Sequence, residues 1–556
     1  MLTTRLPRSN RLAVAVAPAA VPLALSLLLL ASSAGATTIH VPGDFPAIQD
    51  AINSAAVGDT ILVAAGTYNG SANRNLNFAG KDLVLRSSAG SLDTIIDCQQ
   101  LGRGIILTSH ETTASRIEGF TIKNALVVSQ AGGALVSDSG ATIVNCIFDS
   151  NHSDAGGGIW CNRSTLVVTD CTFIDNIGEG QSTYSGYGGG IWIDRLSRAT
   201  IVRSVFERNI SKRGAGVWVG GGAVVDILDC TFLDNLSRSW GGGLGGSAEG
   251  TTLRVIRSTF TRNSASSSGG GISLFSVSPE ITDCQFIDNT STSRGGGMFL
   301  SSSDPTITGT LFSGNTADEA GGGLAGLGSA PTIRNTTFHG NSGFLGGGIY
   351  VGAGDGPSAA VIERSIIAFG TLGEAVFCEP GSSADLSCSD VFGSTGGDWV
   401  GCLETQLGQD GNFALDPLFC NAAGGNFRLT ASSPCAPANS PPGCDLIGAF
   451  PAGCGVGIAD SGAPAAGFQL RVVPNPLFTD GQIEWRNDSS TPIVLKLYDA
   501  AGRLVSERDL GSVAAGHHSL DWEGTFGSRN LASGIYFLRF EGPATRVPAV
   551  RVVITR

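Results

Sequence analysis

The sequence predicts an all-β protein in which a right-handed parallel β-helix is followed by a small β-sandwich. The main observation is a short pattern, Phe-x-x-Asn followed by a glycine cluster, which occurs eight times between Ala141 and Val351. The steps between successive phenylalanines are 25, 33, 26, 28, 26, 26 and 26 residues. The eight pairs are Phe148 and Asn151, Phe173 and Asn176, Phe206 and Asn209, Phe232 and Asn235, Phe260 and Asn263, Phe286 and Asn289, Phe312 and Asn315, and Phe338 and Asn341. The second observation is that residues 468–556 lose the glycine clusters and carry longer alternating stretches.

Each repeat is too short for most paired helices and has the composition of β-strands. A β-branched residue lies five positions before every phenylalanine, from Ile143 in the first copy to Ile333 in the last. A period near 26 residues is typical of a solenoid whose coils bury their apolar faces against one another. We therefore expect three short strands per coil. A leucine-rich repeat has a similar length, but the leucine and asparagine signature that it requires is missing.

The glycine clusters lie at a fixed place in every repeat, from residues 156–158 in the first copy to 346–348 in the last. Together, the Phe-x-x-Asn and Gly-Gly-Ala/Gly-Ile/Leu tetrapeptides resemble the repeats of the polymorphic outer-membrane protein family, over about residues 132–351. The resemblance implies a secreted β-helical protein that acts as an adhesin.

Residues 1–36 have the features of a secretory signal peptide. They combine three arginines with the apolar run Ala19–Ala31 and end in small residues. A membrane anchor is the alternative, but the run is short for a spanning helix. No other stretch could span a bilayer, so we expect a secreted or bacterial cell-surface protein with no transmembrane segment in the mature chain. Removal of the arginines would change the net charge from −13 to about −16, which argues against nucleic-acid binding.

The β-helix is expected to occupy residues 37–359, with a cap at its N-terminal end. Thr37 to Asp97 resembles the opening of many pectin-lyase-like β-helices, in motifs such as Ile39-His40-Val41-Pro42 and Gly66-Thr67-Tyr68. Within this stretch, Phe45–Ala56 has apolar residues at helical spacing. A short amphipathic helix there would cover the exposed core of the first coil.

Residues 360–454 are predicted to form the last coils of the β-helix, which disulfides cross-link. They contain seven of the thirteen cysteines. In an exported chain this density indicates disulfides, and the odd count leaves one cysteine over. A zinc site is the alternative, although neither a Cys-x-x-Cys spacing nor histidines accompany these cysteines. The cysteines of the repeats, such as Cys171 and Cys230, are expected to be buried thiols.

Residues 455–467 are rich in small residues and are predicted to be a linker to a sandwich over residues 468–556. The motifs Val473-Pro474-Asn475-Pro476 and Leu531-Ala532-Ser533-Gly534-Ile535-Tyr536 resemble those of type IX secretion-tail domains and of the immunoglobulin-like domain of flagellar hook-capping proteins. The resemblance implies sorting to, or anchoring at, the cell surface by secretion or anchoring machinery.

Charged residues recur at two positions of the repeat, three before and two after each phenylalanine. Five successive coils alternate Asp and Arg there, for example Asp175, Arg208, Asp234, Arg262 and Asp288. Neighbouring coils stack about 4.8 Å apart, so we expect a ladder of ion pairs rather than catalytic acids. The signatures of polygalacturonase-like hydrolases are absent from the sequence. We therefore predict no catalytic residues, no metal site and no cofactor.

The residue after each glycine-apolar unit is predicted to point outward, and in three successive coils it is a tryptophan. An insertion at residues 179–187 adds two tyrosines beside them. Exposed aromatic rings in a row suit the apolar faces of sugars, with nearby polar side chains bonding hydroxyls. The alternative is that the inserted loop buries the tryptophans as a small satellite core. The predicted ligand-binding residues are Trp160, Trp192, Trp218, Tyr184, Tyr187, Arg163, Asp194 and Arg195.

Two classes of function are consistent with these features. The first is a non-catalytic surface module that binds a polysaccharide or a cell-surface glycan, or acts as an adhesin. The second is a polysaccharide lyase or glycoside hydrolase of the pectin-lyase-like fold. The first is favoured because the sequence shows an aromatic row and no acid–base constellation.

Overall fold

The computed structural model describes residues 36–130, 132–180 and 186–454, and in the C-terminal part residues 469–473, 482–487, 491–499, 503–514, 516–522, 531, 534–542, 545–546 and 550–554. The predicted signal peptide, apart from Ala36, and the predicted linker 455–467 lie outside the described residues, as does Tyr184. No helix in these ranges is long and apolar enough to cross a membrane.

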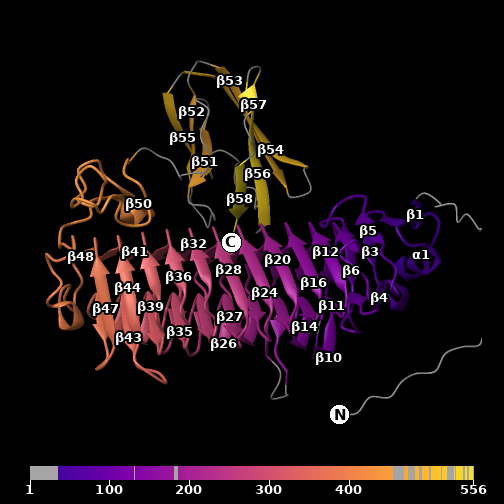
Figure 1. Cartoon of the computed structure of the whole chain (residues 1–556). Helices are drawn as coiled ribbons and strands as arrows, with labels where there is room; N and C mark the ends of the chain where they lie inside the picture. The colour runs from indigo at the N-terminus through magenta and orange to yellow at the C-terminus, as the bar shows by residue number, and fades with distance from the viewer. Residues whose placement is uncertain are drawn as a thin grey trace, which may run out of the picture.

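The predicted right-handed parallel β-helix is confirmed over the first part of the chain (Figure 1). Its strands form four parallel sheets that run along the solenoid and contain 14, 13, 12 and 9 strands, here called sheets A, B, C and D; sheet D is confined to the middle coils. One coil follows the order β16 (Thr165–Thr169) in sheet A, β17 (Thr172–Ile174) in B, β18 (Ile177–Gly178) in D and β19 (Ile191–Asp194) in C. The coils of the repeat therefore have four short strands, and the expectation of three was wrong.

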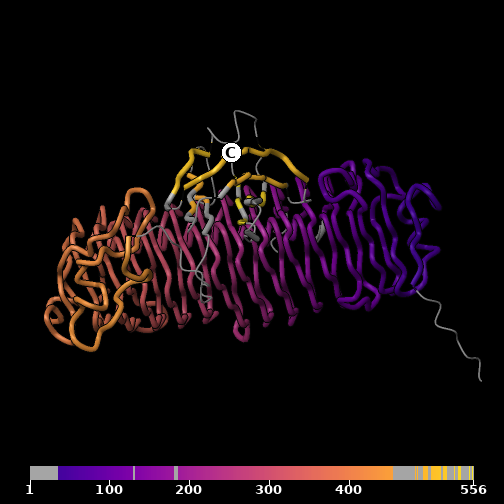
Figure 2. Tube along the Cα trace, turned by 90° about the horizontal axis from the view of Figure 1, so that it is seen from above, coloured from indigo at the N-terminus to yellow at the C-terminus, as the bar shows by residue number. Residues whose placement is uncertain are grey.

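Sheets A, B and C extend from the N-terminal to the C-terminal coils of the solenoid (Figure 2). Sheet A begins at β1 (Thr38–Val41) and ends at β47 (Ser383–Ser387), and sheet B begins at β3 (Gly66–Tyr68) and ends at β48 (Asp390–Phe392). Sheet C runs from β4 (Leu76–Asn77) to β46 (Val376–Cys378), and sheet D from β10 (Leu126–Gln130) to β42 (Ser342–Leu345).

The repeated phenylalanines and asparagines form two continuous columns in the interior. The eight phenylalanine rings form one stack of seven successive pairs, with centroids 4.5–4.9 Å apart. The asparagines form an amide ladder, in which Asn176 Nδ2 donates to Asn209 Oδ1 at 3.0 Å and to the carbonyl of Phe148 at 2.9 Å. These side chains are fully buried, so each bond satisfies an amide that would otherwise cost free energy to bury.

Left-handed backbone lies one residue before each asparagine of the ladder, for example at Asp175 and Arg208. The charged column two residues after each phenylalanine occupies these turns. The other charged column, three residues before each phenylalanine, is left-handed as well, with φ of 55° at Asp170 and 47° at Arg203. The predicted ion pairs form, but each arginine makes its bidentate pair with the aspartate of the preceding coil. The four pairs are Asp170 with Arg203, Asp175 with Arg208, Asp229 with Arg257, and Asp234 with Arg262.

The N-terminal end of the solenoid is covered by helix α1 (Ile48–Ser54), as predicted. Its buried face consists of Ile48, Ala51 and Ile52, which belong to the main hydrophobic core. The Asn73 side chain accepts a hydrogen bond from the backbone nitrogen of Ile48 at 2.9 Å and so satisfies one donor at the start of the helix.

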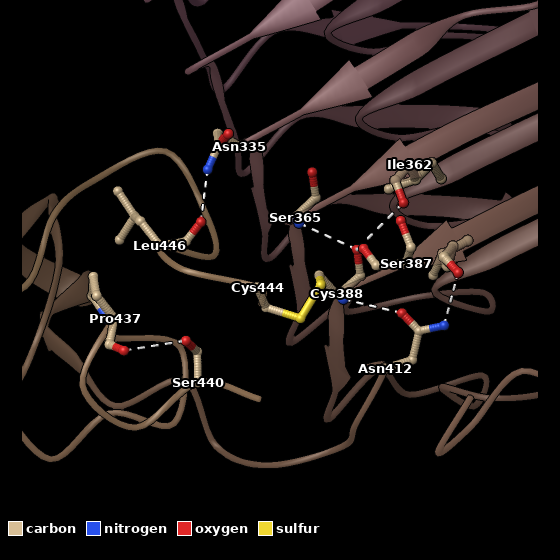
Figure 3. Close-up of a disulfide and its surroundings, with 12 residues drawn as sticks. Asn335, Ile362, Ser365, Ser387, Cys388, Asn412, Pro437, Ser440, Cys444 and Leu446 are labelled. Atoms are coloured by element: carbon tan, nitrogen blue, oxygen red, sulfur yellow. Dashed lines mark hydrogen bonds between the residues drawn. A yellow bond between two sulfur atoms is a disulfide. The ribbon is translucent and has the colours of Figure 1, made fainter. Parts of the chain in front are cut away.

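The C-terminal coils are held by three disulfides, Cys378–Cys402, Cys388–Cys444 and Cys420–Cys454. Cys435 is the seventh cysteine of this region and is a buried free thiol, as are the five cysteines of the phenylalanine repeats. Residues 413–454 fold back onto the outer face of sheet B. Figure 3 shows this packing around Cys388–Cys444, with Asn335 donating to the carbonyl of Leu446 at 2.7 Å. We call residues 413–454 the C-terminal cover.

The predicted sandwich consists of a three-stranded and a five-stranded antiparallel sheet. The first contains β51 (Gln469–Val473), β52 (Gln482–Asn487) and β55 (Gly516–Asp521), and the second contains β53 (Thr491–Asp499), β54 (Leu504–Val513), β56 (Gly534–Gly542), β57 (Thr545–Arg546) and β58 (Val550–Ile554). Both sheets contribute to one core, which includes Trp485, Leu495 and Val552.

Candidate ligand-binding site

The glycine clusters bend the chain sharply where sheet D ends and sheet C begins. The first glycine of each cluster is left-handed, with φ of 57° at Gly214. A Cβ there would lie 2.4 Å from the carbonyl oxygen of Val217, so the bend requires glycine. Because of this bend, the residue before the cluster packs beside the second residue of the sheet C strand. Tyr187 contacts Trp192 and Trp218 in this way, with ring centroids 5.3 and 5.2 Å apart.

Aromatic residues continue along this corner over six coils. Trp160 stacks on Trp192 at 5.3 Å, and Trp240 contacts Phe275 at 4.9 Å. Phe275 in turn contacts Phe299 at 5.7 Å. We call this set the aromatic corner, and its members are Trp160, Tyr187, Trp192, Arg213, Trp218, Trp240, Phe275 and Phe299. It lies on the outer surface of the solenoid, because the alternate residues of the same sheet C strands point into the core.

Arg213 joins the two halves of the aromatic corner. Its guanidinium carbon lies 4.9 Å from the ring centroid of Tyr187 on one side and 4.9 Å from that of Trp240 on the other. One guanidinium nitrogen donates to the Tyr187 hydroxyl. Within the described residues no carboxylate pairs with Arg213, and its Nε has no hydrogen-bond partner. The Nε is a buried atom, so two cation–π contacts and the bond to Tyr187 hold a half-buried positive charge between the two rings.

The predicted row of exposed tryptophans is mostly covered. Trp192 is 9% exposed and Trp218 is 4% exposed, whereas Trp160 and Tyr187 are half-buried. The Trp218 ring lies flat over the next coil, where the matching residue is Gly245, and a Cβ at Gly245 would meet the ring at 2.5 Å. With Tyr187 packed above them, Trp192 and Trp218 form the satellite core that was the alternative expectation.

The three polar residues predicted to bond a ligand lie past the aromatic corner. Asp194 shares the outer face of β19 with Trp192, and burial raises the pKa of its carboxyl. Arg195 is exposed and faces Asp194 at 3.5 Å. Arg163 forms a bidentate pair with Asp138, with Nε 2.6 Å from Oδ1. Only Asp194 is therefore placed beside the aromatic side chains.

Sequence reasoning missed Arg213 and Trp240, although a signal was present. Both residues directly precede a glycine cluster, and the same column contains Tyr187 and Arg294. This column varies from coil to coil in residue type, whereas the tryptophans after the cluster recur in three successive coils. The residues before each cluster are Ala155, Tyr187, Arg213, Trp240, Ser268, Arg294, Ala320 and Leu345.

The carboxylates near the aromatic corner are already paired. Glu179 accepts from Arg238 Nε at 2.6 Å, and Glu319 lies 3.8 Å from Arg294 Nε. In the described ranges no group of three or more His, Cys, Asp or Glu side chains could hold a metal ion. The arrangement offers ring faces, a cation and hydroxyls, which are suited to binding.

The sequence matches the family described as "Right handed beta helix region" over residues 93–245 and 243–412, which is more than half of the chain. The chain belongs to the right-handed β-helix family. Residues 477–542 of this β-helix protein match the family described as "FlgD Ig-like domain", in agreement with the sandwich. Both matches agree with the resemblances found in the sequence.

The comparisons with individual proteins add no activity. Metabotropic glutamate receptor-like protein R of Dictyostelium discoideum is 26% identical over 205 residues, which are 36% of this chain and 11% of that protein. The chain thus spans about a tenth of that relative.

Three solved structures are similar in fold, at low identity. A mannuronic acid-specific polysaccharide lyase of family 6 from human gut microbiota is 11% identical, with a TM-score of 0.38. The match covers 68% of this chain and 91% of the lyase chain. The family 6 alginate lyase AlyGC is 13% identical, with a TM-score of 0.42, over 78% of this chain and 60% of its own. The pectate lyase Pel9A is 14% identical, with a TM-score of 0.30, over 75% of this chain and 97% of its own.

Proposed function

We propose that this β-helix protein is a non-catalytic surface module that binds a polysaccharide at the aromatic corner. The observation that carries the proposal is Arg213, a half-buried cation held between two aromatic rings without a carboxylate partner in the described part of the chain. Sugar rings present apolar faces that pack on aromatic side chains and hydroxyl or carboxylate groups that accept hydrogen bonds from arginine.

The half-buried rings of Trp160, Tyr187 and Trp240 would contact the sugar directly, since Trp192 and Trp218 are covered. The two covered tryptophans would instead hold Tyr187 and Trp160 in place through their ring contacts. Asp194 would accept from a sugar hydroxyl at the edge of the site. The column of contacts follows the solenoid axis, so a linear polymer would lie along it across several coils.

We also propose the route by which the protein reaches its ligand. Residues 1–36 would direct export, residues 37–454 would form the working β-helix, and residues 455–467 would connect it to the sandwich. The sandwich, residues 468–556, would sort the protein to the cell surface or anchor it there.

The proposal is tested by incubating the chain from residue 37 onward with a panel of neutral, uronic-acid and sulfated polysaccharides. Affinity electrophoresis reads retention, and assays for reducing ends and unsaturated sugars read cleavage. We expect retention by at least one polysaccharide with no change in its chain length. Cleavage products would instead establish the alternative, a polysaccharide lyase or glycoside hydrolase.

Trp240→Ala is expected to weaken retention, because it removes one of the two rings that hold Arg213. The matched control is Phe344→Ala. Phe344 is 67% exposed and makes no ring contact in the described part of the chain. Equal loss of retention in both variants would argue against a site at the aromatic corner.

A further inference from the structure

The outer face of sheet B carries a stripe of buried side chains, in which aliphatic residues lie among threonines and one glutamate, Glu207, which is 3% exposed. In its strands the phenylalanine points inward, and the residues on either side point outward. Several of these outward residues in the middle coils are aliphatic, in β21 (Val205–Glu207), β25 (Thr231–Leu233) and β37 (Leu311–Ser313). Val205, Leu233 and Leu311 are only 3%, 0% and 2% exposed, which is unusual for residues outside the core of a solenoid.

At the C-terminal coils the same stripe is covered by a neighbouring segment. Ile366 and Ala368 occupy the matching outward positions, and they pack against Leu429, Cys435 and Ile447 of the C-terminal cover. The backbone nitrogen of Ala449 donates to the Thr337 hydroxyl at 3.0 Å. The cover ends at Cys454, which is bonded to Cys420. The chain therefore leaves the cover on the side of the solenoid that bears the stripe.

The sandwich begins within reach of the middle coils. Residues 454 and 469 are separated by 15 residues, which extend over at most about 50 Å. Coils are stacked about 4.8 Å apart, so this length spans roughly ten of them. In both views the described strands of the sandwich lie over the middle coils (Figures 1 and 2).

A polar contact ties the sandwich to the other end of the stripe. Arg503 pairs with Asp93, and its Nη2 donates to the carbonyl of Ala89 at 3.0 Å. Asp93 directly precedes β6 (Thr94–Asp97), which is the second strand of sheet B. The middle part of the stripe thus lies between the C-terminal cover on one side and this contact on the other.

We infer that the outer face of sheet B, from Thr172 to Ser313, is the docking surface of the C-terminal sandwich of the same chain. The sandwich is then a fixed second layer of the molecule. Removal of water from the aliphatic side chains of the stripe drives the docking, and Arg503 fixes its direction along the solenoid. The aromatic corner is built on sheets C and D, so docking leaves it accessible.

The test compares Leu233→Glu with Val167→Glu in the full mature chain. Leu233 lies in the stripe, whereas Val167 is a half-buried outward residue of β16 in sheet A. Small-angle X-ray scattering gives the radius of gyration, and a broad-specificity protease gives the rate of cleavage within residues 455–467. We expect Leu233→Glu to enlarge the radius and to speed cleavage by at least about tenfold, which corresponds to 1.4 kcal/mol of docking free energy. Val167→Glu is expected to match the unmodified protein.

Three results would overturn the inference. One is an unmodified protein whose radius and cleavage rate already equal those of Leu233→Glu. Another is a dimer by light scattering that Leu233→Glu dissociates, because a second copy would then occupy the stripe. The third is an unchanged radius of gyration in Arg503→Glu, a variant that places like charge opposite Asp93 without touching the solenoid core. This variant must also release the sandwich, so an unchanged radius would contradict the docking even if Leu233→Glu impairs folding.

Discussion

The interior and exterior columns of the solenoid are built on opposite rules. Inside, one residue type is repeated in every coil, as in the phenylalanine stack and the asparagine ladder. Outside, residue types change from coil to coil, and what matters is whether each side chain is paired with its neighbour. Arg262 forms a bidentate pair with Asp234, whereas Arg213 has no carboxylate partner among the described residues. Interior columns therefore identify the fold, and an exterior charged side chain without an ion-pair partner identifies the candidate site.

The largest effect is expected from breaking an interior column. Phe232→Ala removes a fully buried ring that stacks on Phe206 and Phe260 at 4.8 and 4.5 Å. A cavity in a rigid stack cannot collapse, so we expect a loss of about 3–5 kcal/mol in the free energy of unfolding. Chemical denaturation measures this loss. A cost below about 1 kcal/mol would show that neighbouring coils move to fill the gap.

The second prediction concerns an exterior position that the C-terminal cover makes interior. Burial raises the pKa of Asp390 to about 7, although the backbone nitrogen of Leu415 donates to its carboxyl group. The folded protein then holds this proton more tightly than the unfolded chain, so the free energy of unfolding falls as pH rises from about 4 to 7. The fall is at most about 4 kcal/mol.

Asp390→Asn should flatten this part of the stability profile and raise stability above pH 7 relative to the unmodified protein. Thermal melts from pH 4 to pH 8 measure the difference. A profile with the same slope in both proteins would mean that the carboxyl is ionised in the fold.

The smallest effect is expected from an exterior pair. Asp229→Asn removes the bidentate partner of Arg257 while keeping a residue that tolerates the left-handed turn. Both side chains are partly exposed, so the loss should be about 0.2–1 kcal/mol and should shrink in high salt. Asp283→Asn is the control, because the next coil has Gly309 in place of an arginine. An equal loss of stability in Asp283→Asn would show that the ion pair is not the cause of the loss.

The fold was predictable because interior columns have a strict period. Phe173, Asn176 and the cysteines of the repeat were placed correctly from spacing alone. The fourth strand was missed because its length differs from coil to coil, from two residues in β18 to five in β38, so it has no fixed pattern in the repeat. The cover over sheet B was not predictable either, since its contacts, such as Asn335 with Leu446, join residues far apart in the sequence.

The site was predicted only in part because side-chain direction depends on the next coil. The tryptophan column was found, but nothing at Trp218 itself says that its ring lies down over Gly245. Arg213 is recognised as a candidate site residue only once the structure places Tyr187 and Trp240 on either side of it. In physical terms, register fixes which residues are neighbours, and packing decides which of them remain accessible.

The most direct test of the account is a comparison of two arginine variants on whichever polysaccharide the chain retains. Arg213→Gln removes the unpaired cation of the aromatic corner, and Arg262→Gln removes a cation that is already paired with Asp234. We predict that Arg213→Gln raises the Kd by at least about tenfold, or 1.4 kcal/mol, and that Arg262→Gln leaves it unchanged. Equal affinity in both variants and the unmodified protein would contradict a binding site at the aromatic corner.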